Sequence, residues 1–158
     1  MEHRNPGNIV GRHRSLLVLL AALIVLGAAD LAQAWCQPQC VTYARERSGI
    51  WSCRVGAQGT PKDWYYCERS HGKTTSKPKK GRVLILDEFS TGHAMFIEKS
   101  KRKGHGKYKL RLAHSNFDWC CSIERHVKAK YYRHKHKVKI KTGYWRGHRF
   151  KVLGIIKQ

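Results

Sequence analysis

The stretch RVLILDEFSTGHAMFIEKS, residues 82–100, decides the fold class of this chain. Its first six residues, 82–87, form an apolar run of strand length, and HAMFIEKS, residues 93–100, forms a second run. The turn-forming residues Ser90-Thr91-Gly92 separate the two runs. Two such runs joined by a glycine-containing turn predict neighbouring antiparallel strands.

Three further segments continue this pattern toward the C-terminus. YKLRLAHS, residues 108–115, alternates apolar with basic residues, and KVKIK (137–141) and FKVLGII (150–156) also read as strands. The alternating lysines of 137–141 are typical of a half-exposed strand. We therefore expect an antiparallel sheet of about five strands.

A helix is expected ahead of the sheet. Pro38 precedes CVTYARERSG, residues 40–49, whose larger residues recur at helical spacing and whose last residue is glycine. Residues 51–80 lack clear periodicity, and HGKTTSKPKKG, residues 71–81, reads as an exposed loop. A helix followed by a run of strands predicts an α+β protein.

The first 34 residues have the features of a secretory signal peptide. Arg12, His13 and Arg14 precede an uncharged run over residues 15–29, and Ala32-Gln33-Ala34 supplies the small-x-small pattern of a cleavage site. The run is shorter than the ~20 residues that cross a bilayer as a helix. We expect export, removal of residues 1–34, and a domain over residues 35–158 without a transmembrane segment.

All six cysteines lie in this domain, where export would allow disulfides to persist. Spacing does not fix their pairing. The sequence allows two states of Cys40, a disulfide with Cys36 or Cys53, or a free thiol. If Cys40 is free, an odd number of cysteines remains and at most two bridges form among Cys36, Cys53, Cys67, Cys120 and Cys121.

The chain is strongly basic, with a formal net charge of +22. Residues 99–158 carry 19 of the 32 Lys/Arg residues against two carboxylates, a balance of +17. Such a field favours an anionic partner, either an acidic cell-wall polymer, an anionic lipid or a nucleic acid. Export argues against a genomic nucleic-acid role. We therefore expect peptidoglycan or another anionic envelope polymer as the partner.

Three residues form a candidate catalytic set. Cys40 heads the expected helix, His93 begins a strand after a glycine turn, and Asn116 follows the next strand. A helix N-terminus and an imidazole activate a thiol for nucleophilic attack. A third polar group then holds the histidine ring. The order and placement match the papain-like arrangement.

Four motifs carry a family resemblance. CVTYAR (40–45), PKKGRVLIL (78–86), TGHAMFIE (91–98) and HSNFDW (114–119) occur in the order and at similar intervals to those of the CHAP domain, a cysteine- and histidine-dependent amidohydrolase/peptidase. The chain resembles this family over most of the expected domain. The resemblance implies a papain-like fold and cleavage of amide bonds in peptidoglycan peptides, without a cofactor.

The same resemblance implies a role for each candidate residue. Cys40 would be the nucleophile, His93 the base, and Asn116 the polar residue that orients His93. Many members carry a carboxylate two residues before this asparagine, where this chain has His114. Either Asn116 alone orients His93, or Asp118 substitutes, or the site is degenerate and weakly active. The long basic segment beyond Trp119 is also unusual for a compact member.

Two other features of the sequence bear on function. The cysteine and histidine spacings do not form a recognised four-ligand zinc pattern, and lysines and arginines surround the C-terminal histidines. Aromatic residues interleaved with cations in residues 128–151 are typical of a single-stranded nucleic-acid groove, but also of strands with apolar residues inward. The alternative function is a non-catalytic basic protein on a CHAP-like scaffold that holds an anionic envelope polymer or nucleic acid.

Overall fold

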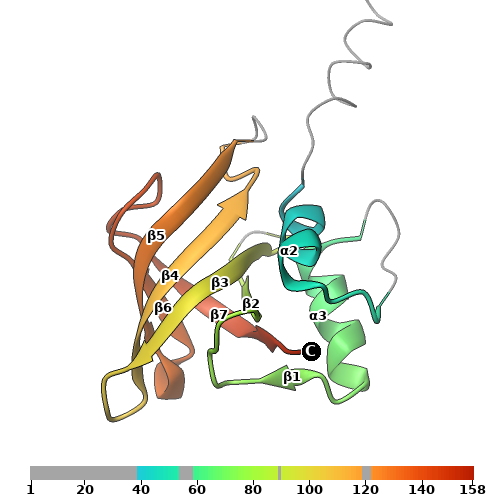
Figure 1. Cartoon of the computed structure of the whole chain (residues 1–158), viewed down its shortest axis with the longest axis horizontal. Helices are drawn as coiled ribbons and strands as arrows, with labels where there is room; N and C mark the ends of the chain where they lie inside the picture. The colour runs from blue at the N-terminus through green and yellow to red at the C-terminus, as the bar shows by residue number, and fades with distance from the viewer. Residues whose placement is uncertain (1–38, 54–58, 89, 119–121) are drawn as a thin grey trace, which may run out of the picture. The chain divides into compact units, whose positions relative to one another are not determined.

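A computed structural model of the chain describes residues 39–53, 59–88, 90–118 and 122–158. The expected signal peptide and cleavage site, and Cys36, Cys120 and Cys121, lie outside the described residues. Within them the chain is α+β, as predicted, with helices preceding an antiparallel sheet (Figure 1). None of the described helices is long and apolar enough to cross a membrane.

The described chain contains two α-helices, seven strands and one short 3₁₀ helix. In chain order they are α2 (Cys40–Ser48), α3 (Pro61–Ser70), β1 (Thr74–Thr75), β2 (Val83–Leu86), β3 (His93–Arg102), β4 (Lys107–Ser115), β5 (Ile123–Tyr132), η1 (Arg133–Lys135), β6 (Lys137–Ile140) and β7 (Arg149–Ile156).

Helix α2 confirms the helix predicted at residues 40–49. It ends at Gly49, which has a φ of 68° and whose N–H donates to Arg45 O at 2.8 Å. Glycine is the residue that adopts this left-handed conformation without steric cost, so the helix stops where the sequence indicated.

Helix α3 was not predicted, because residues 51–80 lacked apolar periodicity. Its start is nevertheless encoded locally, since Thr60 and Asp63 form a reciprocal capping box and Pro61 occupies the first turn. The helix buries Trp64 beside the charged Glu68, so its buried face is not uniformly apolar. That mixture hides the helical period from a hydrophobicity reading.

The sheet has the strand order β1-β7-β2-β3-β4-β5-β6, and β6 also pairs with β7. This additional pairing closes β2 to β7 into a six-stranded barrel, to which the short β1 is attached. All the described pairings are antiparallel. The five predicted strands are present, and β1 and β5 are additional to them.

Strand β5 was not predicted, because basic residues obscure the alternating apolar pattern of its sequence. Val127, Ala129 and Tyr131 are buried, whereas Lys128 and Lys130 between them are exposed. The strand therefore alternates with period two, as a half-buried strand should. Alanine and tyrosine form a weaker apolar pattern than the runs of β2 and β3, and the neighbouring basic residues made the segment read as a binding stretch.

Two apolar cores hold these elements together. One fills the barrel interior and includes Leu84, Leu112 and Ile140, and the other joins α2 and α3 to the sheet through residues such as Ala44, Trp64 and Ile85. Strand β2 contributes to both cores, because Leu84 and Leu86 face one and Val83 and Ile85 face the other. This double burial explains why its sequence is apolar without interruption.

A disulfide between Cys53 and Cys67 ties the segment after α2 to α3. Beside it, Glu68 is fully buried and accepts hydrogen bonds from Cys53 N at 3.1 Å and Trp64 Nε1 at 3.1 Å. The buried Arg45 donates to Cys53 O, and its guanidinium lies 5.0 Å from the Trp64 ring centroid. These buried polar contacts anchor α2 and α3 to each other.

Candidate active site

Cys40 is the first residue of α2, and its sulfur faces strand β3. Among the described cysteines it is the free one, so it does not pair with Cys53. Its side chain is buried, in the core that also contains Ala94. The sulfur therefore lies beside the backbone of β3 at Ala94, the residue that follows His93 in sequence.

The surroundings of Cys40 act on its pKa in two opposite ways. Burial raises the pKa of the thiol, and the backbone N–H groups of Ala94, Val41 and Cys40 itself lower it by hydrogen bonding to the sulfur. Burial is the larger effect, so the resting side chain is a neutral thiol. The same three N–H groups are placed to stabilise negative charge that develops beside the sulfur.

His93 is positioned by the turn that precedes β3. Gly92 has a φ of 79°, and a Cβ at this position would lie 2.8 Å from Leu86 O. Only glycine allows this turn to approach the end of β2 so closely. His93 then pairs with Leu86 across the strands and is buried.

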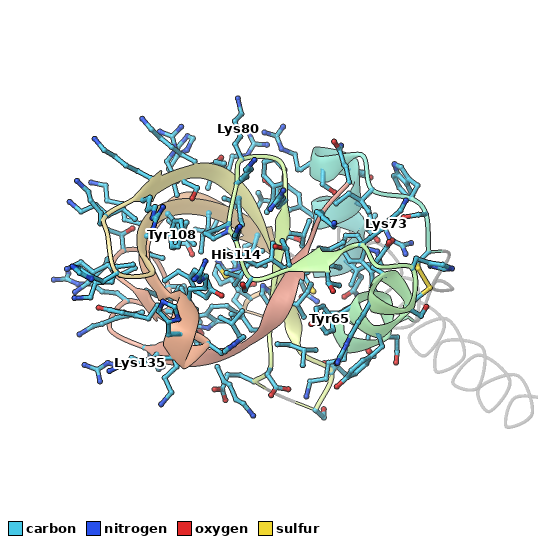
Figure 2. All side chains as sticks on the ribbon, turned by 90° about the horizontal axis from the view of Figure 1, so that it is seen from below. Tyr65, Lys73, Lys80, Tyr108, His114 and Lys135 are labelled. Atoms are coloured by element: carbon cyan, nitrogen blue, oxygen red, sulfur yellow. A yellow bond between two sulfur atoms is a disulfide. The ribbon has the colours of Figure 1, made fainter. Side chains whose placement is uncertain are left out.

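A chain of hydrogen bonds extends from His93 into β5. His93 Nε2 lies 2.9 Å from His114 Nδ1, and His114 Nε2 lies 3.1 Å from Glu124 Oε2. The three residues come from the neighbouring strands β3, β4 and β5. His114 lies inside the ring of strands in Figure 2.

This chain fixes the position of each proton. A carboxylate only accepts hydrogen bonds, so Glu124 requires the hydrogen of His114 to be on Nε2. A neutral imidazole has one N–H, so His114 Nδ1 is an acceptor and His93 Nε2 is the donor to it. His93 Nδ1 is consequently left with its lone pair, in the state that a general base requires.

Aromatic rings enclose the histidine pair. The Trp145 ring centroid lies 4.8 Å from that of His93 and 5.0 Å from that of His114, and Phe117 lies 4.9 Å from His114. Burial in this apolar shell, with a contribution from the neighbouring His114, lowers the pKa of His93 well below 6.5. Burial likewise lowers the pKa of His114 to about 4. Both rings are therefore neutral at pH 7.

The carboxylate of Glu124 is held by the turn between β6 and β7. Tyr144 N donates to Glu124 Oε1 at 3.0 Å, and burial raises the pKa of this carboxyl. Gly143 has a φ of 85°, and a Cβ there would overlap the Glu124 carboxylate. The turn fits around Glu124 because residue 143 has no side chain.

Asn116 is placed differently from the role expected of it. Its Nδ2 donates to Gln39 Oε1 at 2.8 Å, which links the end of β4 to the residue before α2. Its φ of 52° is one that asparagine tolerates better than most residues. The group that contacts His93 Nε2 is His114, the residue at which the sequence departs from the family pattern.

The motifs predicted roles for part of this cluster only. Cys40 and His93 were predicted as nucleophile and base, and His114 was noted only as a departure from the family pattern. Glu124 and Trp145 were missed, because they lie on segments outside the motifs. A signal for Glu124 did exist, since it is one of only two carboxylates among the 60 residues from 99 to 158.

Cys53, Cys67 and His71 form a second group of chemically capable side chains. Their potential ligand atoms lie within 4.8 Å of one another. The two sulfurs are joined in a disulfide, however, and a disulfide lacks the thiolates that bind zinc. This group is therefore structural.

No protein-family model, curated protein or solved structure matches the chain.

Proposed function

We propose that the protein is an exported cysteine hydrolase of the CHAP type with a papain-like catalytic arrangement. It would cleave amide or peptide bonds of peptidoglycan. Cys40 is the nucleophile, His93 is the base, and His114 with Glu124 positions His93. Asn116 positions the start of α2 through Gln39. The disulfide between Cys53 and Cys67 is compatible with export.

The observation that carries this proposal is the direction of the hydrogen-bond chain. It begins at a carboxylate, passes through two buried histidines, and leaves an unprotonated nitrogen on His93. The residue next to His93 contacts a free thiol at a helix N-terminus. A purely structural histidine does not need its partner's tautomer fixed, whereas a general base does.

Acylation is the first half of the proposed reaction. His93 Nδ1 takes the proton of the Cys40 thiol as the sulfur attacks the carbonyl carbon, and a sulfur–carbon bond forms. The backbone N–H groups around the sulfur stabilise the oxyanion. His93 then passes the same proton to the amine nitrogen, the carbon–nitrogen bond breaks, and the amine leaves.

Hydrolysis of the acyl-enzyme uses the same groups. His93 takes a proton from water as its oxygen attacks the thioester carbonyl, and the sulfur–carbon bond breaks. The proton returns to the Cys40 sulfur, and the carboxylic acid product leaves. The histidine changes charge in both halves of the reaction, so the Glu124 carboxylate behind His114 stabilises the transient imidazolium.

The experiment is digestion of purified peptidoglycan sacculi. We expect the protein to release peptides and expose new amino groups, detected by mass spectrometry, and Cys40→Ala to abolish release while binding to sacculi remains. Glu46→Gln, an exposed change on α2, serves as the matched control and should retain activity. Release of the same products by Cys40→Ala would show that the thiol is not the nucleophile, and no release by the unaltered protein would exclude this substrate.

A further inference from the structure

A row of cations crosses the outside of the barrel. Register pairs Lys101 with Lys109, Lys109 with Lys130, Lys130 with Lys139, and Lys139 with Arg149. The five residues come from five consecutive strands, β3 to β7. Directly paired residues of antiparallel strands project to the same side with Cβ atoms about 4.5–5.5 Å apart. The five side chains therefore form a continuous line around the barrel.

This row lies on the outer surface. Its strand neighbours Tyr108, Leu110, Tyr131 and Val138 belong to the core inside the barrel, so the alternating residues face away from it. Lys101, Lys109, Lys130 and Arg149 are exposed, and Lys139 is half-buried. Figure 2 shows the same division, with Tyr108 inside the ring of strands and long side chains radiating from its outside.

The charge of this row is not balanced by the protein. On the rows beside it, Arg111 pairs with Glu98 at 3.4 Å and Lys151 pairs with Asp87 at 3.1 Å. The salt bridges between described residues include none of the five row cations. Neighbouring Lys139, Lys130 and Arg149 lower the pKa of Lys141 by repulsion.

Like charges directly opposite each other destabilise a sheet. The flanking rows also pair cations in register, Lys99 with Arg111 on one side and Lys137 with Lys151 on the other. A carboxylate lies beside Arg111 and another beside Lys151, whereas none of the salt bridges between described residues reaches the five row cations. Placing them in register costs stability, and a bound polyanion offsets this cost. The arrangement is therefore that of a binding site rather than of a simply soluble surface.

The shape of the row indicates the kind of anion. Because it follows the barrel through five of six strands, its cations point in different directions, and a flat membrane or a rigid duplex reaches only some of them. A flexible single chain follows the curve. The exposed large apolar side chains of the described residues, Trp51, Tyr66, Ile123 and Tyr144, do not lie in the row. Sites for single-stranded nucleic acids combine cations with aromatic side chains on which the bases stack, and the five residues of the row include no aromatic side chain.

We infer that the outer face of β3 to β7 binds a flexible polyol-phosphate polymer of the cell envelope through the row Lys101, Lys109, Lys130, Lys139 and Arg149. This site is separate from the thiol. Lys109 and His114 are five positions apart on β4, which corresponds to roughly 16 Å along the strand. Binding at the row does not require Cys40 chemistry, but it would hold the proposed active site beside the envelope.

The test compares two triple variants of equal charge. Lys109→Gln/Lys130→Gln/Lys139→Gln neutralises the centre of the row, and Arg69→Gln/Lys73→Gln/Lys80→Gln removes three cations outside it. The exported chain is titrated with fluorescent poly(glycerol phosphate) over a range of salt concentrations. All binding is measured in the Cys40→Ala background, so a failure of the proposed hydrolysis does not affect the result.

We expect the row variant to bind at least about tenfold more weakly, with the salt dependence of log affinity reduced by about two, as loss of three phosphate contacts on a single chain predicts. The control variant should lose less than about threefold. Replacing the same three lysines by arginine keeps the charge and should keep the affinity. Equal losses in both glutamine variants would overturn the site, because net charge alone would then explain binding.

Two further results decide the ligand and the role. Oligothymidylate with the same number of phosphates should bind more weakly than poly(glycerol phosphate), and equal or tighter binding would overturn the assignment to an envelope polymer. The melting temperature of the row glutamine variant at low salt should equal or exceed that of the unaltered protein. A decrease would overturn the argument that the row is kept at a cost to stability.

Discussion

His93 owes the position of its proton to two residues beyond it. Glu124 orients His114, and His114 orients His93, through bonds of 3.1 and 2.9 Å. Each link removes one tautomer from one ring. If His93 is the base, as proposed, Glu124 is expected to affect the chemistry through two hydrogen bonds without contacting the substrate.

Replacing Glu124 by glutamine tests this link. The amide oxygen accepts from His114 or from Tyr144 N but carries no charge, so we expect a fall in kcat of about 10- to 100-fold, the range for outer partners of a functional histidine. KM should change little, because Glu124 is proposed to act through His114. Nitrogen-15 NMR of the His93 ring gives an independent readout, since Nδ1 should become partly protonated. An unchanged spectrum together with unchanged kcat would contradict the relay.

The buried histidines also make stability depend on pH. The pKa of His114 is about 4 in the folded protein and 6.5 when unperturbed. The unfolded chain therefore binds the proton first, and stability is lost as pH falls from 6.5 to about 4. His93 acts in the same direction. A shift of this size corresponds to roughly 3 kcal/mol between pH 7 and pH 4.

Urea denaturation at pH 7, 5.5 and 4.5 measures this loss. His114→Gln should flatten the pH dependence. Asp63 and Asp87 have lowered pKa values, so their contribution is lost only below the ordinary carboxyl range near 3.8. A flat profile for the unaltered protein above pH 4.5 would contradict the burial of neutral histidines.

At the residue scale, a role can be predicted from sequence when a chemically suitable side chain lies inside a recognisable motif. Cys40 and His93 met both conditions. His114 stands where the family pattern has a carboxylate, so the motif did not predict its role. Its partner Glu124 lies ten residues away on β5, a strand that was not predicted because basic residues interrupt its apolar pattern. Which residue contacts which is a property of strand register, and register is not visible in local composition.

At the scale of elements, the turn between β6 and β7 is part of the candidate site. Tyr144 holds Glu124, and Trp145 covers both histidines. Gly143 permits this because it lacks a side chain. The turn therefore connects the C-terminal strands to the thiol at the other end of the sequence.

Gly143→Ala should displace Glu124 and weaken catalysis, and Gly147→Ala is its matched control. Both glycines have positive φ, 85° and 90°, but no atom lies within 4 Å of a Cβ at Gly147. Each variant should lose about 1–2 kcal/mol from the left-handed backbone. Only Gly143→Ala should also reduce turnover by about tenfold or more. Equal activities at matched stability would show that the turn does not position Glu124.

The disulfide joins the segment after α2 to α3. Its cysteines are 14 residues apart, and a loop of this size predicts about 3 kcal/mol of stabilisation. Cys53→Ser/Cys67→Ser should lower the free energy of unfolding by about this amount in chemical denaturation. A change below about 0.5 kcal/mol would show that the hydrogen bonds of Arg45 and Glu68 to the Cys53 backbone hold this region without the disulfide.

The helices and strands differed in how well their sequences predicted them. Helix α2 and strands β2, β3, β4, β6 and β7 were predicted because turn residues bound an apolar or alternating run. Helix α3 was missed because it buries a glutamate, and β5 was missed because its inward residues are small or aromatic among cations. In both cases burial of polar or weakly apolar groups depends on partners far along the chain.

At the scale of the whole molecule, the basic C-terminal part completes the domain rather than extending it. Strands β5, β6 and β7 close the barrel and carry most of the cation row. Glu124 lies on β5, and Trp145 lies in the turn between β6 and β7. Charge showed from the sequence that this part favours an anionic partner. It did not show that alternate residues of the same strands would face the barrel interior and the solvent.

The central claim is that Cys40 is a thiol made reactive by His93. The most direct measurement is the rate of Cys40 alkylation by iodoacetamide in the native protein at pH 7, mapped by mass spectrometry, beside His93→Ala. The account predicts labelling of Cys40, a rate at least tenfold lower in His93→Ala, and no labelling of Cys53 or Cys67. An unlabelled Cys40, or equal rates in the two proteins, would contradict it.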